Sequence, residues 1–540
     1  MPGNFLDRMT GVQFEAALPE LVKGQRWFGG KARTVERVQI ADRIPILTGS
    51  SDTMLVLIDV VYQDGGQETY ALPLASAFGE EASQIRRDMP RAVFSRFAAD
   101  ETNGFQEGIL YDGTVSVAAM HALVRAMQHG TTFAGEAGSL QASSTPAYEH
   151  MLPPGDDPSL RMLSAEQSNT SVAFGDYAVL KLYRRLYSGL NPDWEIGRYL
   201  TSRAFPYSPA VGGALQYVRS GETATVGLLQ AFVRNQCDAW SATLTQLDGF
   251  LARLAGQSAG VDSGEGRGCG LWDLAQMEPS RAGATLIGAA LDAAASLARR
   301  TAALHLTLGE VTQDPDFVPE SLTLDYRQTR CQSMVESWKR VVQLLNRRSV
   351  TATSLEEEDD RLLAHESNVL GVFRSLLDIA EGGQRIRCHG DYHLGQVLWT
   401  GTDYIVTDFE GEPARPLAER RLKHSPLYDV AGMLRSFDYA AWTALGKHES
   451  TAARQEFEPW TRYWSRWVRA RFLHEYVRQL EHAPFWPPSS KDAARLLTIY
   501  QLEKAVYELG YELNNRPQWV GIPLKGINEI VRMSGAQAAA

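Results

Sequence analysis

The hydrophobic pattern changes its period along the chain. Residues 35–75 hold short runs rich in Val, Ile, Leu and Tyr, such as TMLVLIDVVY, and an Asp-Gly-Gly turn signal follows at 64–66. Such runs between turn residues predict antiparallel strands, so the first 100 residues are expected to be rich in β-structure. Residues 104–157 bring Ser, Pro, Gly and Asp together and predict a loop-rich junction. A new unit is expected to begin near Arg161.

That unit opens with a predicted hairpin, because SVAF and YAVLKLY flank the pair Gly175-Asp176. The run VGLLQAFV at 226–233 predicts a further strand. After a Gly/Ser-rich break at 255–272, the apolar positions recur with a helical period. The predicted helices span 283–307, 325–347, 357–380, 428–445, 457–480 and 491–513. Short apolar runs (IRCH, QVLW and YIVTDF) interrupt them as small strands, so the C-terminal half is expected to be mostly helical.

Composition excludes several classes of protein. The 540 residues are 44% hydrophobic and 22% charged, which is typical of a folded globular chain. The net charge of -11 offers no electrostatic footprint for a nucleic acid or an anionic membrane surface, and no run of about 18 apolar residues occurs. The four cysteines are too scattered for a disulfide framework, which predicts reduced thiols and a cytoplasmic location. Any bound phosphate must be held locally, by a few residues or a metal.

The segment HGDYHLGQ at 389–396, followed by a predicted strand and DFEG at 408–411, has the most specific spacing. A kinase needs a carboxylate to orient the attacking hydroxyl, an amide oxygen five residues later for Mg²⁺, and a further Asp between metal and phosphates. Asp391, Gln396 and Asp408 have this spacing. The pattern therefore predicts phosphoryl transfer from ATP with Mg²⁺, although His-Gly-Asp alone could be a turn with a capping Asp.

A metal site is the alternative for His389 and His393, since two histidines four residues apart share a face of a helix. The intervening Gly-Asp and the flanking strands favour a loop, and the sequence shows no third ligand. We therefore expect His389 to brace the catalytic loop through hydrogen bonds, and His393 to do the same.

The hairpin carries Lys181 in YAVLKLYRR, and Glu195 follows fourteen residues later at the start of a predicted helix, DWEIGRYL. A strand lysine pinned by an acidic residue from a helix forms the ion pair of kinases. Neither residue is expected in the apolar core.

Nucleotide contacts are predicted on both sides of this lysine. The turn before the hairpin has no glycine-rich repeat, so its backbone amides and polar side chains would meet the phosphates. Its residues are Gln167, Ser168, Asn169 and Thr170. The hinge whose backbone meets adenine is expected at Gln230, Phe232 and Val233.

Several segments resemble the bacterial maltokinases, relatives of the aminoglycoside phosphotransferases in the protein-kinase-like superfamily. The matching segments of the kinase part are EQSNTSVAFGDYAVLKLYRR, HGDYHLGQVLW, TDFEGEPARPLAERR and SPLYDVAGMLRSFDYA. GQRWFGGKAR at 24–33 resembles the maltokinase N-terminal cap, and LEKAVYELGYELNNRPQWVGIPLKGI at 502–527 resembles their C-terminal segment.

The resemblance implies an α+β, bilobal protein-kinase-like fold with an N-terminal β-rich cap and a largely helical C-lobe. The expected domains are a cap at 1–105, an intermediate N-lobe with hairpin and hinge at 106–240, and a C-lobe with catalytic loop and sugar site at 241–540. ATP would bind between the lobes and maltose in the C-lobe. The implied reaction phosphorylates the anomeric hydroxyl of maltose, giving maltose 1-phosphate for glycogen and α-glucan synthesis from trehalose.

By the same resemblance, Asp391 is the catalytic base, Gln396 and Asp408 hold Mg²⁺, and Lys181 with Glu195 serves the phosphates. The C-terminal motif implies sugar contacts, and His389 is grouped with them. Those contacts are Glu508, Tyr511, Glu512 and Arg516.

Other functions stay open. A glucosamine kinase, or another sugar kinase of the same fold, could use Glu410, Glu412 and Glu508 around an amine. A catalytically inactive pseudokinase would normally lack one of the four kinase residues, and all are present. An antibiotic-modifying phosphotransferase would leave the cap signature unexplained. Association or fusion with trehalose synthase, which supplies maltose, is an expected partnership, whereas nucleic acids and membranes are not expected partners.

Overall fold

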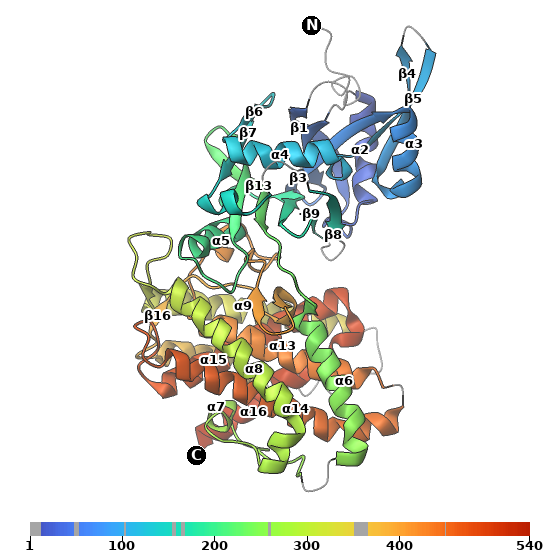
Figure 1. Ribbon diagram of the computed structural model, residues 1–540. Coiled ribbons are helices and arrows are strands. Elements are labelled where there is room, and N and C mark those ends of the chain that lie inside the picture. The colour runs from blue at the N-terminus through green and yellow to red at the C-terminus, as the bar shows by residue number, and fades with distance from the viewer. Residues whose placement is uncertain are drawn as a thin grey trace. The chain divides into compact units, whose positions relative to one another are not determined.

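The computed structural model describes residues 12–47, 53–101, 104–153, 158–163, 168–257, 261–349, 366–448 and 450–539. The chain forms two compact units. The first comprises Met1–Arg234 with Pro416–Ala418, and the second comprises Asn235–Arg415 with Glu419–Ala540. Figure 1 shows most strands in the blue to green part of the chain and most long helices in the yellow to red part.

The first unit begins with an antiparallel sheet in the order β1-β2-β3-β5-β4. These strands are β1 (Val35–Leu47), β2 (Thr53–Tyr62), β3 (Gln67–Phe78), β4 (Val93–Glu101) and β5 (Gly104–Asp112), and the short β11 (Arg185–Leu186) also pairs with β3. The helices α2 (Val12–Lys23) and α3 (Gly79–Asp88) accompany it. The strands predicted within 35–75 are therefore confirmed. The expected cap boundary after residue 105 falls inside β5, which pairs with both β3 and β4.

The segment GQRWFGGKAR packs onto this sheet. The rings of Trp27 and Tyr70 have centroids 5.7 Å apart, and the Arg33 guanidinium lies 3.6 Å from the Tyr62 ring centroid. A Cβ at Gly30 would collide with the Tyr62 hydroxyl, so only glycine fits there. The segment that carries the cap resemblance thus contributes to the core of the first sheet.

The second sheet of this unit is antiparallel, in the order β6-β7-β12-β13-β10-β9-β8. Its strands are β6 (Thr132–Ala134), β7 (Ser139–Ser144), β8 (Leu160–Leu163), β9 (Asn169–Phe174), β10 (Ala178–Tyr183), β12 (Val211–Arg219) and β13 (Glu222–Ala231). The predicted hairpin is β9 with β10, in which Phe174 pairs with Ala178. Gly175 has a φ of 54°, a left-handed conformation that glycine adopts without a steric cost.

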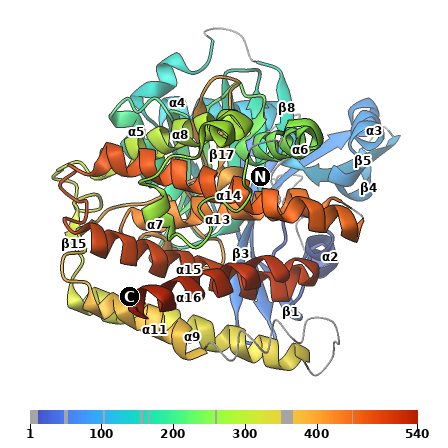
Figure 2. The same ribbon diagram turned by 90° about the horizontal axis from the view of Figure 1, so that it is seen from below.

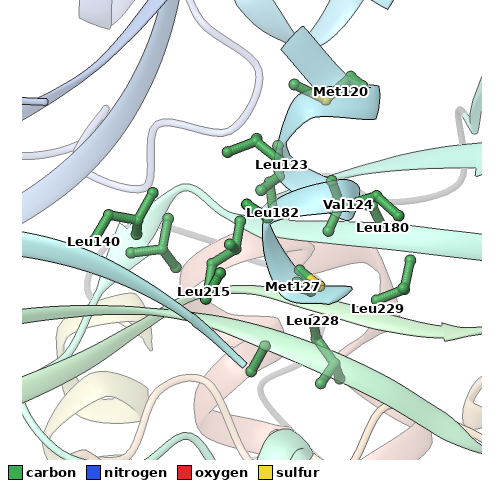
Figure 3. Packing of buried hydrophobic residues seen from close by; sticks show 14 of the residues in the cluster. Met120, Leu123, Val124, Met127, Leu140, Leu180, Leu182, Leu215, Leu228 and Leu229 are labelled. Atoms are coloured by element: carbon green, nitrogen blue, oxygen red, sulfur yellow. The ribbon is translucent and has the colours of Figure 1, made fainter. Parts of the chain in front are cut away.

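Helix α4 (Val117–His129) lies where a loop-rich junction is expected, so that prediction is wrong for these residues. Ser116 caps its start, and Gly130 ends it in the left-handed conformation with a φ of 61°. Figure 3 shows its apolar side chains beside those of the second sheet. The helix contributes Met120, Leu123, Val124 and Met127, which pack with Leu180, Leu182, Leu215, Leu228 and Leu229. Their helical spacing is visible in the sequence, although Gly, Ser and Pro in the surrounding segment obscure it.

Buried polar contacts join the two sheets into one unit. Arg184, next to β10, donates to Asp112 Oδ2 at 2.6 Å and to Thr170 Oγ1 at 2.8 Å. Asp42 of β1 accepts from the Tyr217 hydroxyl of β12 at 2.7 Å. The expected cap and N-lobe therefore form a single compact unit, which also includes α5 (Pro192–Ser202).

The second unit is mainly helical, as predicted. Its longer helices are α6 (Ala239–Gln257), α8 (Arg281–Leu308), α9 (Leu324–Ser349), α11 (Glu366–Arg374), α13 (Leu427–Gly446), α14 (Thr451–Leu480), α15 (Ser490–Asn515) and α16 (Gly521–Ala539). The predicted helix at 357–380 is described only from residue 366, and α6 and α16 were not predicted. Figure 2 shows α9, α15 and α16 side by side. None of the helices in the described ranges is long and apolar enough to span a membrane.

Small strands interrupt these helices. β14 (Cys237–Asp238), β17 (Val397–Trp399) and β18 (Tyr404–Val406) form an antiparallel sheet in that order. The runs QVLW and YIVTDF are thus confirmed as strands. IRCH contributes only an isolated bridge, between Ile386 and His424.

Candidate active site

Two loops at the end of the β17–β18 hairpin carry the predicted kinase residues. The Thr407 N–H donates to the Gln396 carbonyl at 2.9 Å, and His389 Nε2 lies 2.9 Å from the Thr407 carbonyl. These bonds hold the loop that bears Asp391 and Gln396 beside the loop that bears Asp408.

His389 braces this arrangement, as predicted. Its side chain is buried, its Nε2 donates to Thr407, and its Nδ1 accepts the Asp391 N–H at 3.4 Å. Both ring nitrogens are engaged within the two loops, which supports the bracing role of His389, and its grouping with the sugar contacts stays a prediction. His393 lies in the same loop, where its Nδ1 accepts the Gly395 N–H at 3.0 Å. Among the described residues, neither histidine joins a group of three metal-ligating side chains.

Asp429 of α13 holds the start of the loop that bears Asp391, and the sequence pattern predicts no role for it. Its carboxylate accepts the N–H groups of His389 at 2.7 Å and Gly390 at 3.0 Å. His305 Nε2 of α8 lies 3.0 Å from the same carboxylate, and His305 Nδ1 lies 2.6 Å from the Tyr476 hydroxyl. Burial alone would raise the pKa of Asp429, but the bonds from His305 and the loop lower it. A buried, ionised carboxylate thus fixes the backbone beside Asp391.

Asp391 contacts a lysine that the sequence reasoning also missed. Lys504 Nζ of α15 lies 2.9 Å from Asp391 Oδ1 and 3.3 Å from Glu412 Oε2. The Tyr507 hydroxyl donates to Glu412 Oε1. Burial favours the neutral carboxyl, but the charge of Lys504 outweighs it and holds the pKa of Asp391 well below its usual range. Asp391 is therefore ionised at neutral pH. Burial opposes the charge of Lys504, yet the two carboxylates keep the pKa of its ammonium well above the ordinary value.

Asp408 has a φ of 65°, in the left-handed region that residues other than glycine rarely adopt. Such strained positions cluster at functional sites because the surrounding structure has to hold them. Gln396 and Asp408 offer an amide and a carboxylate oxygen, the donor types that Mg²⁺ prefers. The donor chemistry of these two residues therefore fits a magnesium ion.

In the first unit, Lys181 of β10 is buried and pairs with Asp193 of α5, at 3.0 Å between Nζ and Oδ2. The Tyr183 hydroxyl donates to the same Asp193 oxygen at 2.9 Å. Glu195, the predicted partner, is buried on the same helical turn. The expectation that Lys181 and Glu195 lie outside the core is wrong. Asp193 precedes Glu195 by two residues, and both lie in the first turn of α5. Acidic side chains are favoured in the first turn of a helix.

Replacing Lys181 with Ala is expected to lower the free energy of unfolding by roughly 3–5 kcal/mol, because it removes the cation 3.0 Å from buried Asp193. Urea denaturation measures this change. Lys447→Ala is the matched control, since Lys447 forms an exposed pair with Asp248 at 2.7 Å and such pairs contribute about 0–1 kcal/mol. Equal losses in the free energy of unfolding would show that the buried pair contributes no more to stability than the exposed pair.

Some residues of the predicted nucleotide-binding turn and hinge form bonds within the first unit. Gln167 lies outside the described residues, Ser168 is exposed, and Asn169 begins β9. The Thr170 hydroxyl accepts from Arg184 and so supports the unit's interior.

In the predicted hinge, Gln230 pairs with Val179 inside the second sheet. The Phe232 N–H donates to the Tyr177 carbonyl at 2.9 Å, so that donor does not face outward. Val233 follows β13 in a loop.

The predicted sugar contacts lie further along α15. Glu508 accepts from Arg435 Nη2 at 2.7 Å, and Glu512 accepts from Arg516 Nη2 at 2.6 Å. Tyr511 is 44% exposed. With a rise of about 1.5 Å per residue, position 512 lies about 12 Å along the helix from Lys504. The structure therefore places Lys504 beside Asp391 and Tyr507 beside Glu412. Of the predicted sugar contacts on this segment, Glu508, Glu512 and Arg516 lie in ion pairs.

Sequence comparisons agree with this architecture. The profile of the maltokinase N-terminal cap domain matches residues 22–115, and that of the phosphotransferase enzyme family matches residues 232–485. The chain thus resembles a maltokinase cap over residues 22–115 and a phosphotransferase over residues 232–485. The resemblance inferred from the motifs is confirmed.

Two curated relatives are glucosamine kinases. The one from Mycolicibacterium smegmatis is 25% identical over 370 residues, which are 67% of this chain and 77% of that protein. The one from Streptacidiphilus jiangxiensis is 22% identical over 374 residues, covering 69% and 73%.

A solved structure of a glucosamine kinase in complex with glucosamine, ADP and inorganic phosphate aligns with a TM-score of 0.59 at 18% identity. It covers 95% of this chain and 98% of that one. A second structure, glucosamine kinase crystal form B, gives 0.60 at 19% identity, with 95% and 99% covered. These likenesses bear on the fold alone, and they confirm the predicted α+β kinase-like class.

Proposed function

We propose that this protein is an ATP-dependent sugar kinase that phosphorylates the anomeric hydroxyl of maltose and produces maltose 1-phosphate. The observation that carries the proposal is Asp391, an ionised carboxylate in a loop fixed by Asp429 and His389. Kinase catalysis is mostly positioning and electrostatic stabilisation, so a rigidly held carboxylate beside the acceptor hydroxyl is its central protein group.

In this proposal Asp391 orients the sugar hydroxyl. Its Oδ1 is bonded to Lys504, and its Oδ2 faces His393 Nε2 at 3.8 Å. Oδ2 is then the oxygen offered to the hydroxyl. Because the pKa of Asp391 is low, it is a weak base, and it accepts the proton only as the new oxygen–phosphorus bond forms. Burial lowers the pKa of His393, so its ring is neutral and does not compete as a cation.

Gln396 and Asp408 are the residues we assign to Mg²⁺, and Lys181 is assigned to the phosphates of ATP. Bound Mg²⁺ neutralises charge on the transferring phosphoryl group. The left-handed backbone at Asp408 and the cross-loop bond of the Gln396 carbonyl support this assignment, because both hold the backbone that carries the two donor side chains. The ADP bound in the glucosamine kinase complex supports the choice of nucleotide.

Maltose is favoured by the maltokinase cap at 22–115 and by the C-terminal segment 502–527. Glucosamine is the second candidate, favoured by the two curated relatives, which are both glucosamine kinases. A pseudokinase is disfavoured because Lys181, Asp391 and Asp408 are all present. We expect the reaction in the cytoplasm, with trehalose synthase as a source of maltose.

The experiment is an ADP-release assay with Mg-ATP and a panel of sugars. Maltose is expected to stimulate release most, and glucose and glucosamine weakly. Trehalose should have no effect, because both of its anomeric hydroxyls are in the glycosidic bond. A preference for glucosamine over maltose would establish the second candidate instead. Release that no sugar stimulates would contradict the kinase proposal.

A further inference from the structure

The second unit holds two carboxylates around one ammonium. Lys504 Nζ lies 2.9 Å from Asp391 Oδ1 and 3.3 Å from Glu412 Oε2, and all three side chains are at least four-fifths buried. The Tyr507 hydroxyl takes the remaining oxygen of Glu412. The Lys504 ammonium thus already occupies the position at which a cationic ligand would pair with Asp391 and Glu412.

The neighbouring acidic residues of α15 are also neutralised by the chain. Glu503 forms ion pairs with Arg330 and, at 3.3 Å, with Arg415, and Glu508 lies 2.7 Å from Arg435. Each of these carboxylates is buried and committed to a guanidinium. Around Asp391, α15 therefore presents an ammonium and a tyrosine, and its glutamates are already bound to arginines.

This charge distribution bears on the choice between sugars with hydroxyl groups alone and sugars with an ammonium group. A protonated amine needs an uncommitted carboxylate, and next to Lys504 it would meet a like charge. A neutral hydroxyl can accept from the ammonium and donate to Asp391 or Glu412. Sites that pair polar groups closely reject analogues that leave those groups unmatched.

We propose that Lys504 is the residue that selects neutral sugars and excludes amino sugars. The inference rests on the proposed function and narrows its substrate class. Lys504 acts partly through Asp391 and Glu412, whose charge it balances, so it is a specificity-determining and positioning residue. Removing its charge would leave two adjacent carboxylates, which an ammonium group could then neutralise from the ligand.

The test compares glucose with glucosamine, which differ in a hydroxyl against an amine at one carbon. Binding of each sugar is measured by calorimetry on the full chain with Mg-ADP, at a pH where glucosamine is protonated. The parent should bind glucose more tightly than glucosamine. Lys504→Met should shift the ratio of the two Kd values toward glucosamine by at least about tenfold, the scale of one charge-assisted hydrogen bond.

Three further variants complete the design. Lys504→Arg keeps the charge and should retain the parent ratio. Lys504→Gln replaces the Met variant in the binding measurement if circular dichroism shows that Lys504→Met has a much lower melting temperature than the parent. Lys447→Met removes an ammonium from an exposed pair on the same unit and should leave the ratio unchanged.

Tighter binding of glucosamine than glucose by the parent overturns the inference without any variant. Equal weakening of both sugars in Lys504→Met also overturns it, because a purely structural role changes both alike. The predicted order of binding without any sugar-dependent ADP release would support the inference and contradict the proposed function.

Discussion

Replacing Asp391 with Asn is expected to lower kcat by about 10²–10⁴-fold while the affinity for Mg-ATP stays close to that of the parent. The substitution keeps the shape of the side chain and removes the anionic oxygen that orients the sugar hydroxyl. Lys504 retains Glu412 as a partner at 3.3 Å, so the fold should persist. Steady-state ADP release gives kcat, and calorimetry gives the nucleotide affinity.

The matched control is Asp248→Asn. Asp248 lies on the same unit, and its side chain is half exposed. Within the described residues it forms a surface ion pair with Lys447. Its substitution should leave kcat unchanged. An Asp391→Asn variant that turns over within a few-fold of the parent would remove Asp391 from the role of base.

Replacing Asp429 with Ala is expected to destabilise the protein by roughly 3–5 kcal/mol and to abolish most turnover. The change leaves the N–H groups of His389 and Gly390 and the ring of His305 without their buried acceptor. Urea denaturation measures the stability, and the ADP assay measures the turnover of the fraction that remains folded.

Asp429→Asn separates the hydrogen bonding of Asp429 from its negative charge, because the amide keeps one oxygen acceptor for the loop. Its loss of stability should be smaller than that of the Ala variant, and Asp248→Ala should cost little. If Asp429→Ala were as stable and as active as Asp248→Ala, Asp429 would not hold the catalytic loop.

The features that the sequence predicted correctly are those set by residues close together in the chain. The helical periods gave α8, α9, α13, α14 and α15 close to their observed bounds, and Gly175-Asp176 gave the hairpin. The spacing of the HGDYHLGQ and DFEG segments predicted two neighbouring loops, and in the structure both segments flank one short hairpin. His389 was correctly expected to brace that loop.

Long-range partners could not be read from local patterns. Lys504 is 113 residues from Asp391, and Asp429 is 40 residues from His389. No periodicity or turn signal reports which lysine or aspartate folds back onto a loop. Glu508 looks available in the sequence, but Arg435, 73 residues away, binds it in the fold.

The most direct measurement of the proposed maltose 1-kinase activity is phosphorus nuclear magnetic resonance of the product formed from maltose and Mg-ATP. We predict an acid-labile phosphate coupled to the anomeric proton of maltose, formed by the parent chain and nearly absent with Asp391→Asn. A phosphate on the 6-hydroxyl, or a product formed equally by both proteins, would contradict this activity.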